Sequence, residues 1–397
     1  MQHGKDPLRA ADVRQRNEKI VLRLIHAKGE RGLSQSEAVV ATGLKAPTIF
    51  RIFSNLEAAG LIENLPSPAA PTAGQEAKVE RKGRRPSVYI VRRSAHSLIG
   101  VEFWAARVSI GVFDFLGGEL SSRVLPVAKG MDAEGVCAVI GDLVDAAIAE
   151  LGLERGKVLG LGLGAPGQVN VRNRTVSFYS RTPGFVDFPI ASRLEERLGL
   201  PVTVHNNCSV IALSEFRYGG LAAGGPMFMF LLRSGVNGAF IDSGRIHLTS
   251  EGTTIETGHI PVDVEGPACS CGARGCLEAC LAALDTKNLD EGGSLFESLG
   301  PALSSGQGQE AEAVLRKAAI HLAQAVRIAC QLFNPRSVLF VAASAAVAEA
   351  LARLVRELVT HEVSGFGRIL PEFHARAYDP VLAQRGAAAL VLDAFLG

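Results

Sequence analysis

The stretch that decides the reading of this chain runs Thr257-Gly-His259, then nine residues, then Cys269-Ser-Cys271-Gly-Ala-Arg-Gly-Cys276-Leu-Glu278. Three of the seven cysteines of the chain lie in this stretch, and a histidine lies just upstream of them. Three thiolates and one imidazole are the Cys3His ligand set of a closed tetrahedral zinc site. Glycines lie between the second and third cysteines, where a tight loop needs them. The pattern predicts zinc bound by His259, Cys269, Cys271 and Cys276.

Two alternatives explain this cluster less well. Reduced thiols gathered by chance would not follow the pattern Cys-x-Cys-Gly-x-x-Gly-Cys. Cysteines separated by one residue rarely form a disulfide, and the sequence shows no secretory signal. Four protein ligands leave no open position for water, so we expect a structural rather than a catalytic metal. Cys280, one helical turn after Cys276, is a conceivable fifth ligand, but we expect it to lie in the core.

The composition indicates a large protein without a membrane span. A chain of 397 residues predicts two or three domains, and a hydrophobic fraction of 47% supports a large core. No apolar run approaches the roughly 18 uninterrupted residues of a membrane span. The start of the chain, Met-Gln-His-Gly-Lys-Asp, is polar and lacks an apolar signal core. We therefore expect a cytoplasmic protein with reduced cysteines.

Charge is divided unevenly along the chain. Residues 1–93 carry 17 Lys and Arg against 9 Asp and Glu, a net charge of +8, whereas the remaining 304 residues carry a net charge of −7. A basic N-terminal part on an acidic body predicts that nucleic acid binds at one end only. A solvated charged surface is the alternative.

The N-terminal part has the pattern of a winged helix-turn-helix. Residues 10–27 carry apolar side chains at helical spacing. Ser34 and Glu37 form a capping box for a second helix, and Pro47 lies in the first turn of a third. Two strands, at 61–63 and 87–91, would form a wing. Residues 1–65 are therefore predicted to be a helix-rich DNA-binding domain; the alternative is a three-helix module that binds protein.

The third helix is predicted to enter the major groove of DNA by its N-terminal end. The predicted DNA-contacting side chains on and before this helix are Lys45, Thr48, Arg51, Ser54 and Asn55. Residues 66–93 are predicted to form a wing and linker, which contains the basic segment Gly83-Arg84-Arg85-Pro86. Arg84 and Arg85 are predicted to contact phosphates or reach into the minor groove. A solvated linker is the alternative for this segment.

Residues 94–397 read as an α/β domain, because strands alternate with helices and several strands end in glycine-rich turns. Ligands in such sheets bind beyond the carboxyl ends of strands. Gly164–Gly167, Asn206 with Asn207, and Glu256–His259 all follow strands or lie on connecting loops. We expect these residues to line one cleft.

On these motifs the chain resembles transcriptional regulators of the ROK family (repressors, open reading frames and kinases). The resemblance covers essentially the whole chain. The motifs that carry it are Gly164-Ala-Pro-Gly167, Asn206, Glu256-Thr-Gly-His259, the Cys269–Glu278 motif, Gly83-Arg-Arg-Pro86 and Arg385-Gly-Ala-Ala-Ala389. The resemblance implies an actin-like, two-lobed sugar-kinase fold with a sugar in the cleft between the lobes. It also implies zinc on one histidine and three cysteines.

Within this family the chain resembles a regulator more than a kinase. The kinases carry Asp-x-Gly-Gly-Thr after the first strand, where this chain has Glu102-Phe-Trp104-Ala-Ala. Trp104 would block the close approach of phosphate to the backbone. Their second phosphate loop resembles Gly-Thr-Gly-x-Gly, and here it reads Arg233-Ser-Gly-Val-Asn237. Their catalytic aspartate corresponds to Asn207, whose amide cannot accept a proton at neutral pH. We therefore expect no enzyme activity; an ATP-dependent hexose kinase is the alternative.

The resemblance assigns Asn206, Asn207, Glu256 and His259 to a sugar or sugar-phosphate effector, and the backbone near Gly167 can add further contacts. His259 would bind zinc through one ring nitrogen and a sugar hydroxyl through the other. A turn at the two asparagines and a surface role for Glu256 are the alternatives, and no effector at all is a third. We further expect a homodimer or homotetramer that binds a double-stranded, palindromic operator.

Overall fold

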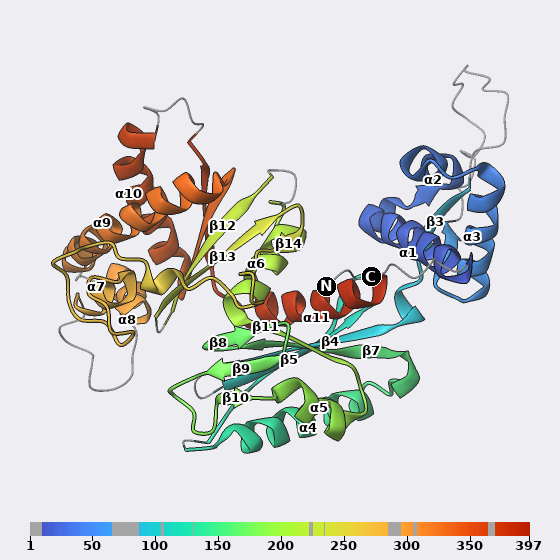
Figure 1. The fold of residues 1–397 in the computed structure, drawn as a ribbon, viewed down its shortest axis with the longest axis horizontal. Helices are drawn as coiled ribbons and strands as arrows, with labels where there is room; N and C mark the ends of the chain where they lie inside the picture. The colour runs from blue at the N-terminus through green and yellow to red at the C-terminus, as the bar shows by residue number, and fades with distance from the viewer. Residues whose placement is uncertain are drawn as a thin grey trace, which may run out of the picture.

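The computed structural model describes residues 10–65, 87–104, 107–128, 130–221, 225–233, 235–284, 295–304, 308–363 and 370–397. The chain forms an N-terminal head and a body of two lobes (Figure 1). The C-terminal helix runs between the two lobes, and its end reaches the head. Short 3-10 turns occupy Gly29–Arg31, Arg93–Ala95 and Arg155–Lys157.

The head has the predicted winged helix-turn-helix arrangement. Its helices are α1 (Ala10–Lys28), α2 (Gln35–Thr42) and α3 (Ala46–Ala58), and its strands are β1 (Leu33–Ser34), β2 (Ile62–Leu65) and β3 (Val88–Val91). The strands pair antiparallel in the order β1-β3-β2. Strand β3 thus comes from the segment predicted as wing and linker.

Local sequence signals set the helix ends in the head. The predicted capping box at the start of α2 is confirmed: the Ser34 hydroxyl accepts from the Glu37 N–H, and the Glu37 carboxylate accepts from the Ser34 N–H at 2.8 Å. Helix α3 carries proline in its first turn, where no N–H partner is needed. Four apolar side chains of α3 are buried against the rest of the head: Ile49, Ile52, Phe53 and Leu56.

The first lobe is built on a five-stranded sheet in the order β11-β7-β4-β5-β6. Its strands are β4 (Ser97–Trp104), β5 (Arg107–Asp114), β6 (Glu119–Pro126), β7 (Val158–Ala165) and β11 (Val202–Asn206). Helices α4 (Ala133–Glu150) and α5 (Ile190–Leu198) cover one face of the sheet. A small antiparallel sheet adds β8 (Gln168–Asn170), β9 (Thr175–Phe178) and β10 (Val186–Phe188).

The second lobe repeats this strand order on a sheet of its own, β14-β13-β12-β15-β16. Its strands are β12 (Met227–Leu232), β13 (Val236–Asp242), β14 (Arg245–Ile246), β15 (Ser337–Ala342) and β16 (Glu372–Ala377). Its helices are α7 (Leu277–Ala282), α8 (Leu295–Ser304), α9 (Gly308–Phe333) and α10 (Ala345–Val363). In each lobe three antiparallel strands in sequence are followed by two parallel ones. The predicted two-lobed, actin-like α/β fold is confirmed.

Helices α6 (Asn207–Tyr218) and α11 (Pro380–Leu396) lie between the two sheets. Along β12, Met227 and Met229 face these two helices, whereas Phe228 and Phe230 face the helices of the second lobe. Because both faces of the sheet are covered, its central strands are continuously apolar.

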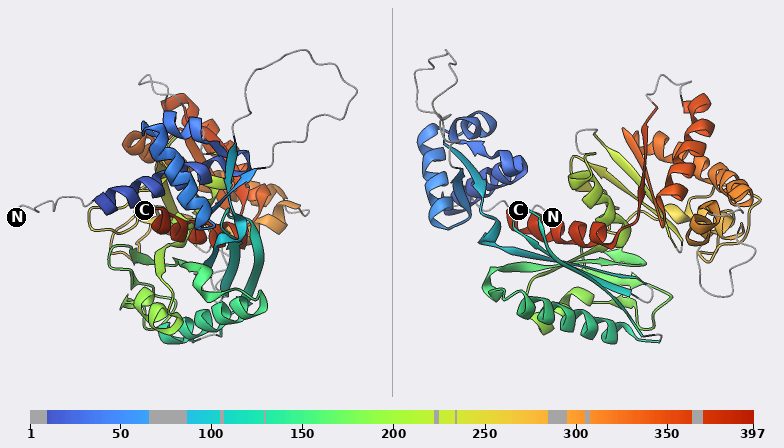
Figure 2. Two further views of the ribbon diagram at one scale, coloured as in Figure 1. Left: turned by 90° about the vertical axis from the view of Figure 1, so that its right-hand side faces the viewer. Right: turned by 180° about the vertical axis from the view of Figure 1, so that it is seen from behind.

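Helix α11 packs closely on the first sheet. A Cβ atom at Gly162 of β7 would overlap the backbone carbonyl of Ala387 in α11. Farther along, Leu392 and Leu396 of α11 share one core with Val21 and Ile25 of α1. Figure 2 shows the C-terminal end of α11 next to the head. The head therefore packs on the body through a buried apolar contact.

Polar contacts add to this junction. The His26 Nε2–H donates to the carbonyl oxygen of Phe115 at 2.9 Å, and Arg23 donates to the carbonyl oxygen of Leu396. Burial lowers the pKa of His26, which favours the neutral form of its imidazole at the junction. Among the described residues, no helix is both long and apolar enough to cross a membrane.

We predict that Gly162→Ala lowers the free energy of unfolding by about 3 kcal/mol or more, because the new methyl group must displace α11 from the sheet. Thermal and urea unfolding measure the change. The matched control is Gly156→Ala, at a glycine with open space around its Cβ position. Equal stability of the two variants would contradict the close packing of α11.

Candidate functional site

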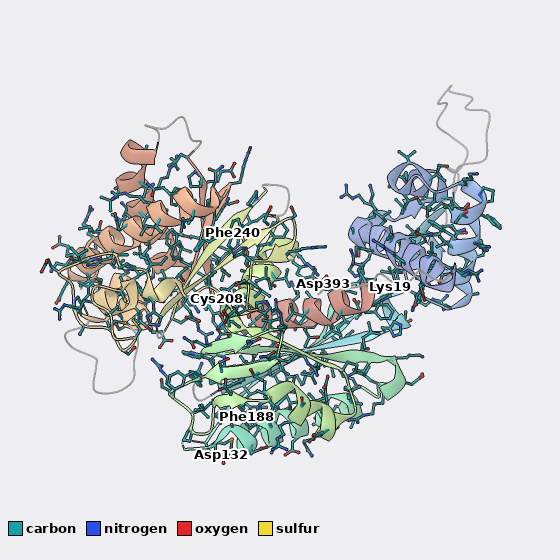
Figure 3. All side chains as sticks on the ribbon, viewed as in Figure 1. Lys19, Asp132, Phe188, Cys208, Phe240 and Asp393 are labelled. Atoms are coloured by element: carbon teal, nitrogen blue, oxygen red, sulfur yellow. The ribbon has the colours of Figure 1, made fainter. Side chains whose placement is uncertain are left out.

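A cavity of about 710 Å³ has walls from both lobes. All five residues predicted to bind a sugar line it: Gly167, Asn206, Asn207, Glu256 and His259. They come from the turn after β7, the junction of β11 with α6, and a 3-10 turn at Thr257–His259 with the residue before it. Figure 3 labels Cys208, which lies at the start of α6, between the two lobes.

Asn206 joins two walls of the cavity. Its Oδ1 caps α6 by accepting from the Cys208 N–H at 2.8 Å, and its Nδ2 donates to the carbonyl oxygen of Gly167 at 2.8 Å. Asn207 also accepts from the Cys208 N–H. Both asparagines are buried. Neither asparagine lies in a turn with positive φ: Asn206 is the N-cap of α6, Asn207 is its first residue, and both side chains line the cavity.

The neighbouring histidine is structural. His205 is buried, and its Nδ1 accepts the Asn206 N–H at 2.9 Å. Burial lowers the pKa of His205 to about 3, so the ring stays neutral and keeps this acceptor. His205 thus fixes the backbone from which Asn206 and Asn207 extend.

Two carboxylates approach each other in the cavity. Burial, together with the nearby charge of Glu278, raises the pKa of Glu256 to about 7. Glu278 lies in the first turn of α7 and lines the same cavity. Sequence reasoning did not include Glu278 among the candidate sugar ligands. Its position two residues after Cys276, a predicted metal ligand, was the available signal.

The four predicted metal ligands form one cluster. One ligand atom from each of His259, Cys269, Cys271 and Cys276 lies within 4.8 Å of the others. Cys269 Sγ is 3.5 Å from His259 Nδ1, and Cys271 Sγ is 3.6 Å from Cys276 Sγ. In tetrahedral zinc coordination, with bonds of about 2.1 Å to nitrogen and 2.3 Å to sulfur, these separations would be about 3.6 and 3.8 Å. The residues therefore fit a closed tetrahedral metal site.

Backbone hydrogen bonds shape the loop from Cys269 to Cys276, which carries three of these four residues. The Cys269 N–H donates to Ala273 O at 2.8 Å, and the Gly272 N–H donates to Cys269 O at 3.0 Å. Gly272 and Gly275 have φ of 91° and 66°, and a Cβ at Gly275 would overlap the Asp263 backbone. These two glycines confirm the tight loop that the sequence predicted. Cys280 is buried, and the metal cluster found among the described residues does not include it.

The N-terminal half of α3 presents a mixed cationic and polar surface. Lys45, Arg51 and Ser54 are exposed, and Thr48 is half-buried. Asn55 is also exposed, but its Nδ2 donates to Glu18 of α1 at 2.8 Å. This bond directs the Asn55 side chain toward α1. Arg84 and Arg85 lie outside the described residues.

An exposed aromatic ring also lies on α3, where sequence reasoning had not selected it. Phe50 is 62% exposed, although its neighbours Ile49 and Ile52 are buried. The signal for it was available, because position 50 falls between the two predicted DNA-contacting positions Thr48 and Arg51. An apolar ring beside cationic side chains matches the mixture of methyl groups and phosphates that the major groove of DNA offers.

The structure thus combines a winged helix-turn-helix head with a two-lobed α/β body that holds a polar interlobe cavity and a Cys3His cluster. The ROK family model matches residues 98–394. The chain belongs to the ROK family.

Solved structures agree with this assignment. A ROK family transcriptional regulator, described as a homologue of the E. coli MLC protein, superposes with a TM-score of 0.78 at 19% identity over 97% of this chain and 98% of that one. At that identity the match shows the fold alone. A ROK hexokinase from Thermus thermophilus has a TM-score of 0.61 at 26% identity, covering 74% of this chain and 96% of its own.

Curated relatives include both a regulator and a kinase. A putative xylose repressor from a Caldicellulosiruptor species is 26% identical over 196 residues, 49% of each chain. A glucokinase from Halalkalibacterium halodurans is 30% identical over 186 residues, 47% of this chain and 56% of its own. The chain spans about half the length of the curated relatives it matches.

We predict that Cys271→Ser loses a bound divalent metal ion that the wild-type protein carries, because the loop then offers two thiolates in place of three. Metal content of the purified proteins measures this. Cys280→Ser is the matched control, since Cys280 is a buried cysteine one turn along the chain from Cys276, and it should keep the metal. A metal-free wild type would contradict the site.

Proposed function

We propose that this protein is a sugar-responsive DNA-binding transcriptional regulator, a repressor of genes of carbohydrate metabolism. The observation that supports this most is the joining of a winged helix-turn-helix head to a ROK body through one shared apolar core. Residues 1–65 would bind DNA, residues 66–93 would form the wing and linker, and residues 94–397 would bind the effector. Such a protein would act in the cytoplasm, where it meets DNA.

The cavity favours binding over phosphoryl transfer. A kinase needs a carboxylate near the sugar hydroxyl to accept its proton. The position that the family resemblance assigns to this base holds Asn207, whose Oδ1 accepts the Cys208 N–H. At the positions that would hold phosphate, Trp104 and Arg233 pack against each other. These replacements support a regulator without kinase activity.

A monosaccharide suits the cavity. Asn206, Glu256, Glu278 and His259 offer hydrogen-bond donors and acceptors on several sides. Glu256, with a pKa near 7, can donate or accept near neutral pH. The names of the relatives suggest xylose and glucose as first probes. Their sugar phosphates are the second class to test.

Zinc is the metal that the Cys3His set fits best, because thiolate and imidazole ligands in a closed tetrahedron are its preferred structural environment. It would stabilise the loop from Cys269 to Cys276 and hold His259 at the cavity wall. With four protein ligands the ion would have no position left for a substrate.

DNA binding would use the N-terminal half of α3 in the major groove. Lys45 and Arg51 would contact phosphates or guanine, and Phe50 would contact a thymine methyl group. Two-fold symmetry of a homodimer, or of pairs within a homotetramer, would match a palindromic operator. Effector binding would change the relative populations of two arrangements that differ in DNA affinity.

We predict that Arg51→Ala weakens binding to a DNA duplex selected by the wild-type protein from a random library. A lost base contact costs about 1–3 kcal/mol, so the Kd should rise roughly tenfold or more. Gel shift at fixed salt measures this. Arg316→Ala, which removes an exposed arginine of α9, should bind like wild type. Unchanged affinity of Arg51→Ala would remove α3 as the recognition helix.

We predict that D-xylose, D-glucose or one of their phosphates raises the melting temperature and alters DNA affinity. A ligand at one hundred times its Kd stabilises the folded state by about 2.7 kcal/mol. Glu256→Gln should reduce the sugar-induced rise in melting temperature. Glu251→Gln should not, because Glu251 is exposed, although it also lies on the connection from β14 to α7. If no sugar changes either quantity, the effector part of the proposal fails; ATP-dependent phosphorylation of a sugar would support the kinase instead.

A further inference from the structure

A buried ion pair connects the two lobes beside the cavity. Glu102 lies in β4 of the first lobe, and Arg233 directly follows β12 of the second. Arg233 Nη1 is 2.9 Å from Glu102 Oε1, and the side chains are 8% and 3% exposed. The hydroxyl of Tyr378, which follows β16, donates to the other carboxylate oxygen of Glu102. One carboxylate of the first lobe is thus held by two side chains of the second.

Aromatic rings enclose the guanidinium of this pair. Arg233 Cζ lies 3.8 Å from the ring centroid of Trp104 and 3.8 Å from that of Tyr378. Trp104 is the last residue of β4, so this stacking also crosses between the lobes. A planar guanidinium stacks on aromatic faces while its N–H groups bond in the ring plane. Arg233 therefore contacts the first lobe through both its charge and its flat face.

The cluster lies at the wall of the proposed effector cavity. Trp104 and Arg233 line it together with Asn206 from the first lobe and Glu256 from the second. Because binding groups come from both lobes, the angle between the lobes sets the distances among those groups. A contact that fixes this angle determines the shape of the cavity.

A buried ion pair is a poor source of stability, since desolvation offsets most of its Coulomb attraction. Its geometric demands are strict, however, because the Arg233 side chain must at once bond the Glu102 carboxylate and stack on the rings of Trp104 and Tyr378. Few lobe angles satisfy all of them at once.

We infer that Arg233 is a positioning residue of the effector cavity, which acts by holding the two lobes at the angle that keeps the binding groups facing one another. The effector part of this inference rests on the proposed function. The contact between the lobes does not, and it can be measured without any ligand.

The chain supplies its own reporter, because Trp104 is its single tryptophan. Arg233→Met keeps an unbranched side chain and removes the charge and the flat face. Arg233→Lys keeps the charge alone. The double variant Glu102→Gln, Arg233→Met avoids a buried unpaired carboxylate and serves if Arg233→Met fails to fold. Arg155→Met, which removes an ion pair with Asp145 within the first lobe, is the matched control.

The first measurement is acrylamide quenching of Trp104 fluorescence in the ligand-free proteins. Arg233→Met and the double variant should expose Trp104 to the quencher and shift its emission maximum, Arg233→Lys should do so less, and Arg155→Met should match wild type. Quenching and emission unchanged in both folded variants that lack Arg233 would overturn the contact between the lobes.

The second measurement is the Kd of whichever of D-xylose, D-glucose and their phosphates stabilises the wild-type protein most. Arg233→Met should raise this Kd roughly tenfold, and the Kd of Arg233→Lys should lie between those of wild type and Arg233→Met. Altered fluorescence with unchanged sugar affinity would overturn the positioning role. If no sugar binds wild type, the proposed effector fails and with it the role of Arg233 in the cavity, while the quenching result still decides the contact between the lobes.

Discussion

The close packing of α11 on the first sheet is the constraint on which the rest of the molecule depends. Only a residue without a Cβ fits at Gly162 under the backbone of α11. The helix then contacts α6 along its length, and Arg217 of α6 pairs with Asp393 of α11 at 2.6 Å. Leu396, near the end of the same helix, belongs to the core of the head. The cavity, where α6 begins, is thus joined to the head by two packed helices.

This continuity matters for how an effector can act. Rigid, packed elements move as units, whereas a flexible linker would absorb a small displacement. The Asn206 side chain bonds both the first turn of α6 and the Gly167 turn. A ligand that moves these groups therefore acts on α6 directly. His26, a half-buried residue at the other end of this path, bonds the body through the carbonyl oxygen of Phe115.

Sequence alone predicted the elements whose signals are local. The capping box at Ser34, the proline at the start of α3 and the cysteine spacing each depend on neighbouring residues. The first two predictions are confirmed, and the four predicted metal ligands lie in one cluster. Sequence alone did not predict strand β1, the small sheet β8–β10, strand β16, or helices α6, α7, α8 and α11. Strand β1 has two residues, and α11 is rich in small apolar residues on all sides, so neither shows a clear period.

Long-range contacts lay beyond sequence reasoning for a physical reason. Glu102, Arg233 and Tyr378 are brought together by strand order, and nothing local to any one of them indicates the other two. Sequence reasoning selected Trp104 and Arg233 only as departures from phosphate loops. Asn55 is a case in which a long-range contact alters a local prediction. Its position on α3 predicted a DNA contact, but its amide donates to the Glu18 carboxylate of α1. Its role at DNA remains a prediction.

A metal ion held by His259 and the three cysteines of the loop from Cys269 to Cys276 would influence the chemistry of the cavity beside it. Nδ1 of His259 is the nitrogen that faces the cysteines, 3.5 Å from Cys269 Sγ. An imidazole that binds a cation through Nδ1 keeps its proton on Nε2, so that this nitrogen can only donate. His259 also lines the cavity with Glu256, three residues before it. A bound metal would therefore fix one donor on the cavity wall beside a carboxyl group whose pKa is near 7, and a sugar hydroxyl, which both donates and accepts, can satisfy the two together.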